Sequence, residues 1–365
     1  MDCLAEGIAA QRAGQVDDAM RLFRAAARAT PLDNRPRHNL GWLLYERRQV
    51  QEAEAEFRAA MALKPEETAH HMGLGYVLQQ CGRFAEAEAE FREALRLSPD
   101  HNAARVALSF QILAQGRLAE GFALSEHRVK PDATGQFTMP EWRGEPLDGR
   151  RLLVWREQGF GDQIQMARFL PALTGGDITY SGFPPIAPII EQFPGIRYQR
   201  LVDMNHYDLW TVPMSLPHRL GVTEQTLPTA PYISGRATRR GGIGVMWRGN
   251  AQPDPDRSLP QALAGALLSL PGAVSLAPED TGATDFQATA DLIAGLDAVV
   301  SVDTSVAHLA GAMGKPLHVM LPALGADWRW MRGETCIWYP TARLHRQTTH
   351  GDWGPVLEAV IRALT

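Results

Sequence analysis

Residues 296–316 read LDAVVSVDTSVAHLAGAMGKP, and this stretch decides the fold of the second half of the chain. The apolar run 297–302 predicts a buried strand that opens at the small polar residues 303–305. Residues 306–313 are helical in character, and a Gly-Lys-Pro sequence ends the helix. A further apolar run, 317–321, completes a β-α-β unit, which indicates an α/β sheet.

A helix that follows a parallel strand directs its free N–H groups to the edge where open α/β sheets bind ligands. Such N–H groups suit a phosphate, so Asp303, Thr304, Ser305 and Val306 are candidate binding residues. Helix capping alone also explains Asp, Thr and Ser at this place. The spacing by itself therefore leaves both interpretations open.

Four motifs follow one another in a recognisable order. They are RLLVWREQGFGDQIQMARFLPAL at 151–173, GIGVMWRGN at 242–250 with Arg257-Ser258, Asp303-Thr304-Ser305 with His308-Leu309, and DWRWMRGETCIWYPTARLHRQ at 327–347 followed by GDW. The ordered set resembles the heptosyltransferase-like glycosyltransferases of family 9. The resemblance covers roughly residues 150–365 and implies a GT-B architecture, in which two Rossmann-like halves bind a nucleotide sugar between them.

The first third of the chain repeats with a period of 34 residues. Four sets of positions keep this step: Phe23, Phe57 and Phe91; Pro31, Pro65 and Pro99; Gly7, Gly41 and Gly75; and Ala19, Ala53 and Ala87. This period and these residue types are the tetratricopeptide signature, which predicts an α-solenoid. Three repeats are clear, and a degenerate fourth carries Ser125 where a phenylalanine is expected.

We expect the following domains from these patterns: a tetratricopeptide array at 1–130, a linker at 131–150, a short acceptor-side half at 151–235, a donor-side half at 240–350, and a C-terminal helix at 351–365 that crosses back. A solenoid presents a concave groove suited to protein segments. Tyr45 of the second repeat and Tyr76 of the third lie on the groove-facing helices and are candidate acceptor-binding residues.

Inverting sugar transfer needs a base that takes the proton of the acceptor hydroxyl. The resemblance implies that Asp162, on the Gly-Asp turn after the first strand, is that base. Asp162 at the N-cap of a helix is the plainer interpretation, and Glu157 is an alternative base. Gln163 is a candidate for positioning the acceptor.

The leaving diphosphate needs positive charge and hydrogen-bond donors. Arg248 and Arg257 are candidates, because a guanidinium binds phosphate oxygens with two donors. Trp328 and Trp330 follow the 317–321 run. One interpretation is that Trp328 stacks on the donor, and the other is that these large rings close the cleft between the two halves. The resemblance implies no metal and no cofactor, and we interpret the Asp254-Pro255-Asp256 sequence as a turn.

The 365 residues carry a net charge of −5, which argues against a general nucleic-acid-binding protein. Three widely spaced cysteines outside any Cys-x-x-Cys pair fit a reducing cytoplasm. We expect a cytoplasmic chain with no signal peptide and no membrane span.

The resemblance to bacterial flagellin glycosyltransferases, which share this domain order, implies sugar transfer to Ser or Thr of a protein captured by the array. One alternative keeps the transferase and makes lipopolysaccharide core the acceptor. Another alternative is a non-catalytic repeat scaffold with a degenerate nucleotide-sugar-binding domain. The shortness of the first half favours this alternative. The sugar, the nucleotide and the oligomeric state stay open.

Overall fold

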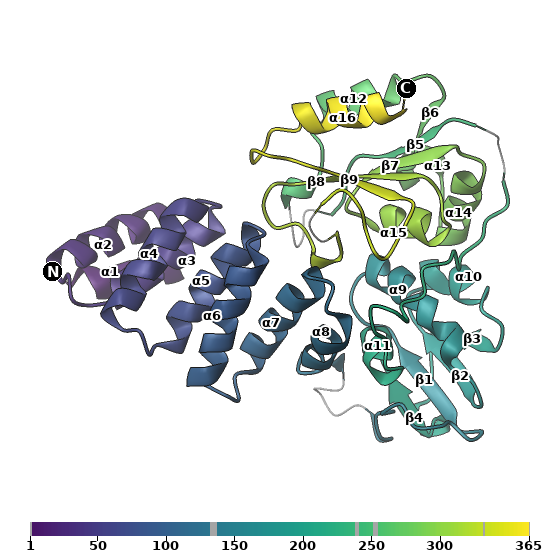
Figure 1. The fold of residues 1–365 in the computed structure, drawn as a ribbon, viewed down its shortest axis with the longest axis horizontal. Helices are drawn as coiled ribbons and strands as arrows, with labels where there is room; N and C mark the ends of the chain where they lie inside the picture. The colour runs from purple at the N-terminus through teal and green to yellow at the C-terminus, as the bar shows by residue number, and fades with distance from the viewer. Residues whose placement is uncertain (1, 132–136, 238–240, 251–254, 331–332, 365) are drawn as a thin grey trace. The chain divides into compact units, whose positions relative to one another are not determined.

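The computed structural model describes residues 2–131, 137–237, 241–250, 255–330 and 333–364 (Figure 1). The chain divides into two compact units. The first comprises Met1–Gln115 with Ala123–Arg128, and the second comprises Gly116–Phe122 with Val129–Thr365.

The first unit is an array of antiparallel helix pairs. Its helices are α1 (Cys3–Arg12), α2 (Val16–Ala29), α3 (Arg35–Glu46), α4 (Val50–Leu63), α5 (Thr68–Gln80), α6 (Phe84–Leu97) and α7 (Asn102–Ala114). The helix α8 (Leu118–Ser125) is shared between the two units. The expected tetratricopeptide solenoid is confirmed.

Contacts between glycine and phenylalanine explain why the 34-residue period is kept. The rings of Phe23, Phe57 and Phe91 are completely buried. A Cβ atom at Gly7 would lie 2.7 Å from the ring of Phe23, and one at Gly75 would lie 2.6 Å from that of Phe91. Because real Cβ atoms essentially never come so close, these ring positions require glycine on the facing helix.

The second unit begins with a parallel four-stranded sheet of order β3-β2-β1-β4. Its strands are β1 (Arg151–Trp155), β2 (Asp177–Ser181), β3 (Ile196–Tyr198) and β4 (Leu209–Thr211). The helical segments that connect them are α9 (Phe160–Met166), which continues as η2 (Ala167–Ala172), then η3 (Pro184–Ile186), α10 (Ala187–Ile190), η4 (Met204–His206), η5 (Pro213–Ser215) and α11 (Leu216–Arg219). Five of these segments contain proline, which lies inside η2 and in the first turn of η3, α10, η5 and α11.

A second parallel sheet follows, with the order β6-β5-β7-β8-β9. Its strands are β5 (Ile243–Met246), β6 (Ala273–Ser275), β7 (Ala298–Val302), β8 (Leu317–Leu321) and β9 (Ala342–Arg346). The remaining helices are η6 (Pro255–Arg257), α12 (Gln261–Leu268), α13 (Pro278–Thr281), α14 (Phe286–Ala294), α15 (Ser305–Ala312), η7 (Trp328–Trp330) and α16 (Gly354–Leu364). Two parallel α/β halves agree with the expected GT-B-like architecture.

The last helix corrects one expectation. Val356, Leu357 and Val360 of α16 form a buried cluster with residues of β5, β7, β8 and α12 (Figure 1). The apolar face of α16 is therefore satisfied by the second half, and the helix packs there instead of crossing back to the first. Strand β9, at the edge of the same sheet, was missing from the sequence-based expectation.

The two sheets are joined where α9 and α15 face each other (Figure 1). A Cβ atom at Gly161 would lie 2.7 Å from Cδ2 of His308, so only glycine permits this approach. This contact brings the Gly-Asp turn of the first half close to the Asp303-Thr304 motif of the second. Within the described residues, no helix has the length and apolar character needed to cross a membrane.

Candidate functional site

The site lies at the C-terminal end of β7, where α15 begins. The N-cap residue is Thr304, with φ −146° and ψ 171°, and its side chain makes no capping hydrogen bond. The Thr304 hydroxyl lies 3.1 Å from that of Ser301 instead. Ser305 and Val306 form the first turn, so their N–H groups lie at the positive end of the helix dipole.

Arg257 lies against this helix start. Its Nη1 donates to the backbone oxygen of Asp303 at 3.4 Å, and its Nε and Nη2 donate to the backbone oxygen of Asn250 at 3.0 and 2.7 Å. A Cβ atom at Gly249 would lie 2.8 Å from Nε of Arg257 and 3.1 Å from Cγ2 of Thr304. The glycine of the Trp-Arg-Gly-Asn sequence therefore allows a cation and a helix N-terminus to meet.

The carboxylate of Asp303 sits in an unusual environment. Its burial, reinforced by the negative charge of Asp327, raises its pKa to about 7. The positive charges of Arg257 and Arg329 oppose that rise. The charged form of this carboxyl is therefore less favourable here than in water.

His308 has a packing role in this arrangement. Its Nδ1 lies 3.0 Å from the Tyr339 hydroxyl, and its ring stacks on Trp330 with centroids 5.0 Å apart. Burial, followed by the charges of Arg329 and Arg168, keeps the pKa of His308 well below its ordinary value. The imidazole is therefore neutral and is held between two aromatic rings.

Asp162 lies in the first turn of α9, whose N-cap residue is Gly159. The expectation that Asp162 is itself the N-cap is therefore wrong, because the helix begins at Phe160, two residues earlier. The Oδ2 atom of Asp162 accepts from the N–H of Gly159 at 2.9 Å, which closes the turn. The side chain is 22 % exposed, so it remains accessible.

Arg329, a residue of the fourth sequence motif for which no role was expected, also links the two halves. Its Nη2 donates to Oδ1 of Asp162, and its Nη1 donates to both oxygens of Asp327 at 2.9 and 3.0 Å. Its Nε donates to Oε1 of Gln165 at 2.6 Å. Burial lowers the pKa of Arg329, but Asp162, Asp327 and Asp303 outweigh it and raise that pKa, so the guanidinium stays charged.

Trp328 and Gln163 lie in packed positions. Trp328 is 7 % exposed, and its ring contacts Phe122, Trp338 and the guanidinium of Arg329. Gln163 is fully buried, and its Oε1 accepts from the Tyr180 hydroxyl at 2.9 Å. Both side chains therefore support their neighbours here, and the geometry gives no support for stacking on the donor or for contact with the acceptor.

Two further candidates are Arg248 and Glu157. Arg248 pairs with the carboxylate of Glu279, and its guanidinium lies 4.9 Å from the Trp247 ring. Glu157, the alternative base, is 7 % exposed. Asp254 lies outside the described residues, and no group of three or more potential metal ligands occurs among the residues that are described.

The remaining candidates belong to the helical array. Tyr45 and Tyr76 are half-buried and lie on either side of Trp42, with ring centroids 5.6 and 5.8 Å from it. The Nε1 of Trp42 donates to His38 at 3.2 Å, and Nδ1 of His38 lies 3.1 Å from Nδ1 of His70. Helices α3 and α5 thus share one continuous row of aromatic rings.

Comparison with known families agrees with this geometry. The tetratricopeptide repeat model matches residues 4–68, 38–102 and 72–124, and the glycosyltransferase family 9 (heptosyltransferase) model matches residues 253–319. The chain carries tetratricopeptide repeats and a glycosyltransferase family 9 domain. The second match contains Arg257 and the Asp303-Thr304-Ser305 motif.

Individual relatives are distant. Protein FlbA of Caulobacter vibrioides is 24 % identical over 311 residues, which are 67 % of this chain and 52 % of FlbA, so the chain spans about half the length of this curated relative. A solved structure of MamA from AMB-1 is 25 % identical, covering 34 % of this chain and 68 % of its own, with a TM-score of 0.32. The Arabidopsis OM64 TPR domain is 25 % identical, covering 30 % and 90 %, with a TM-score of 0.29.

Proposed function

We propose that the chain transfers a sugar from a nucleotide-sugar donor to Ser or Thr hydroxyls of a protein acceptor. One observation carries the proposal: Arg329 joins Asp162 of the first half to Asp327 of the second, beside the start of α15. This contact supports the proposal that the candidate base Asp162 and the candidate anion-binding start of α15, which are far apart in the sequence, serve one site.

The donor is proposed to lie with its diphosphate at the N-terminus of α15. Arg257 and the N–H groups of Ser305 and Val306 supply positive charge and donors where negative charge develops on the leaving group. Asp303 takes up a proton as the diphosphate arrives, which removes the repulsion between two anions. This arrangement performs the stabilisation without a metal ion or cofactor.

The transfer step inverts the configuration at the anomeric carbon of the sugar. Asp162 accepts the proton of the acceptor hydroxyl, the hydroxyl oxygen forms its bond to the anomeric carbon, and the bond from that carbon to the diphosphate breaks. The electron pair leaves with the diphosphate. Arg329 holds the Asp162 carboxylate in place for this step through a buried charged hydrogen bond.

The helical array is proposed to capture the acceptor protein, with Tyr45 and Tyr76 of the aromatic row in contact with it. Aromatic rings give large contact area at low cost in conformational entropy. The family resemblance favours a flagellin-like acceptor. We propose that the reaction takes place in the cytoplasm, because the three cysteines are widely spaced and form no Cys-x-x-Cys pair, as is usual in a reducing compartment.

Thermal unfolding of the full chain with a panel of nucleotides and nucleotide sugars tests the donor half of this proposal. The true donor at about 100 times its Kd should stabilise the folded protein by about 2.7 kcal/mol. Arg257→Gln should lower the affinity for the same nucleotide sugar by about tenfold or more, since a charged hydrogen bond contributes about 1.5–3 kcal/mol. Arg197→Gln, at an exposed position paired with Asp177, is the matched control.

Mass spectrometry of candidate acceptors incubated with that donor tests the transfer half. We expect sugar on Ser or Thr, unchanged when a chelator is added. Transfer to lipopolysaccharide core instead would establish the lipid-linked acceptor. Donor binding without transfer or hydrolysis would identify a non-catalytic scaffold.

A further inference from the structure

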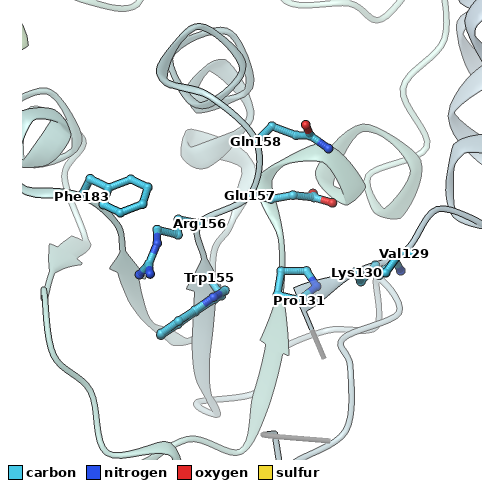
Figure 2. A pocket seen from close by; sticks show the side chains of 8 residues that line it. All are labelled: Val129, Lys130, Pro131, Trp155, Arg156, Glu157, Gln158 and Phe183. Atoms are coloured by element: carbon cyan, nitrogen blue, oxygen red, sulfur yellow. The ribbon is translucent and has the colours of Figure 1, made fainter. Parts of the chain in front are cut away.

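A pocket of about 400 Å³ opens at the C-terminal end of β1 (Figure 2). Its lining residues are Val129, Lys130, Pro131, Trp155, Arg156, Glu157, Gln158 and Phe183. The volume lies in the range of small-ligand sites, about 300–1,000 Å³. Two of these side chains expose large apolar surfaces, since Val129 is 84 % and Phe183 is 46 % exposed.

Arg156 is the most informative residue of the pocket. Its guanidinium lies 4.9 Å from the Trp155 ring and 4.4 Å from the Phe183 ring. Figure 2 shows Arg156 between these rings, while Glu157 leaves the loop toward the other side. No carboxylate in the described part of the chain pairs with Arg156. A guanidinium that contacts rings through its faces keeps its in-plane N–H donors for a carboxylate.

A second cation lies near the first. Arg200 lies two residues after the end of β3, is exposed and also has no carboxylate partner among the described residues. Burial raises the pKa of the Tyr198 hydroxyl, and the charges of Arg200 and Arg156 oppose that rise. Both guanidinium groups therefore act electrostatically on the same Tyr198 side chain, and both residues follow the C-terminal ends of neighbouring parallel strands of the sheet. Two unpaired cations at one sheet edge favour an anionic ligand.

The pocket also lies on the loop that carries the proposed base. Residues 155–158 line the pocket, and Asp162 follows in the first turn of α9. The backbone N–H of Arg156 donates to Ser181 at 2.8 Å, which fixes this loop to the end of β2. The lining residue Gln158 is therefore only four positions from Asp162 in the sequence, the residue proposed to deprotonate the acceptor hydroxyl.

We propose that this pocket holds an extended segment of the protein acceptor, and that Arg156 binds an acidic side chain of that segment near the modified Ser or Thr. This inference rests on the proposed function. It adds that the enzyme prefers an acceptor sequence with an acidic residue near the modified Ser or Thr. Trp155, Phe183 and Val129 supply apolar walls for the neighbouring side chains. The array would provide affinity for the whole acceptor, and the pocket would select the residue that is modified.

Equilibrium binding of fluorescent heptapeptides to the full chain tests this proposal. Each peptide has a central Ser and one Glu at one of the other six positions, and each has a counterpart with Gln at that position. At least one Glu peptide should bind about tenfold or more tightly than its Gln counterpart, as expected for a charged hydrogen bond. Arg156→Gln should abolish this difference and leave the Gln peptides unaffected.

Two further variants sharpen the test. Phe183→Ala removes an exposed ring, so the variant should fold normally. It should lower the affinity for the Glu peptides and for the Gln peptides alike. Arg197→Gln changes an exposed arginine of β3 that pairs with Asp177, and it should keep the full preference for Glu. The Arg156 effect is thereby separated from a general change in surface charge.

Three outcomes would overturn the proposal: no peptide prefers Glu, the preference survives Arg156→Gln, or glucuronate competes for the pocket more tightly than every peptide. The last result would assign the pocket to an acidic sugar. Nucleotide-sugar binding is measured on the same preparations. If it persists while the peptides fail, only this inference is wrong; if it is absent as well, the proposed function fails.

Discussion

The two carboxylate oxygens of Asp162 accept hydrogen bonds from different halves of the transferase unit. Oδ2 accepts from Gly159 on its own loop, and Oδ1 accepts from Arg329 of the other half. Because Arg329 also pairs with Asp327, it stays compensated when the charge of Asp162 is removed. The role of Asp162 can therefore be tested by a substitution that conserves its shape.

Asp162→Asn should lower kcat by roughly 10²-fold or more and leave nucleotide affinity nearly unchanged. The amide keeps the size of the side chain but accepts no proton. Steady-state kinetics with the identified donor and acceptor measures the effect, and Asp177→Asn, at a half-buried aspartate of β2 that pairs with Arg197, is the control. Full turnover in the Asn variant would remove Asp162 from the mechanism and make Glu157 the next residue to test.

A pair of histidines makes the second sheet sensitive to acid. The Nδ1 atom of His318 lies 3.0 Å from Nε2 of His345. Burial, with the charges of His345 and Arg343, lowers the pKa of His318 to about 4. The unfolded chain has the ordinary pKa of about 6.5 and binds the proton first. The contribution of His318 is therefore complete above pH 6.5 and declines as the pH falls toward 4.

His318→Gln should flatten the loss of Tm between pH 6.5 and 4.5 relative to the unmodified chain. The amide forms hydrogen bonds without titrating. Thermal unfolding followed by tryptophan fluorescence at several pH values gives the two slopes, and His206→Gln at an exposed position is the control. Parallel slopes for the His318 variant and the unmodified chain would show that the pair does not govern acid stability.

At the scale of the elements, local patterns could be predicted from the sequence and long-range pairings could not. The 34-residue period and the β7-α15-β8 unit follow from residue types that lie close together in the chain. The contact from Arg329 to Asp162 spans 167 residues, and nothing near Arg329 indicates its partner. Strand β9 is a five-residue edge strand with two buried apolar residues, Ala342 and Leu344, which is too weak an alternation to identify.

A proline substitution can remove a single backbone N–H group from the proposed donor-binding start of α15. Thr304 has φ −146°, which proline cannot adopt, whereas Ser305 is the first helical residue, where proline is well tolerated. Ser305→Pro should weaken nucleotide binding by about 3- to 10-fold through the loss of one donor, with little change in Tm. Calorimetry measures the affinity.

The matched control for this helix is α12. Gln261 is the first residue of α12, is exposed and follows an extended residue, so Gln261→Pro makes the same change at a helix outside the site. It should leave nucleotide affinity unchanged. Equal affinities for the Ser305 and Gln261 variants would mean that the phosphates bind elsewhere.

For the whole molecule, the second compact unit begins at Gly116, before the last residue matched by the tetratricopeptide repeat model. Phe122, in α8, is fully buried within the second unit, with its ring centroid 6.3 Å from Trp328 and 6.1 Å from Trp338. Trp328 in turn lies against the guanidinium of Arg329, which holds Asp162. A shortened chain that begins at Gly116 therefore preserves the packing beneath the candidate site, whereas removal of residues 1–130 would not.

Deletion of residues 1–115 should spare nucleotide-sugar binding and slow donor hydrolysis while lowering kcat/KM for the protein acceptor by about 10²–10⁴-fold. Docking on the array makes delivery of the hydroxyl intramolecular, and that effective concentration is lost with the array. Steady-state kinetics of the full and shortened chains on one acceptor measures the loss, with circular dichroism as the check of folding. Short peptides that reach only the transferase unit should react equally well with both forms. Equal kcat/KM on the intact acceptor would show that the array serves another purpose, and a small or lipid-linked acceptor would then fit the transferase better.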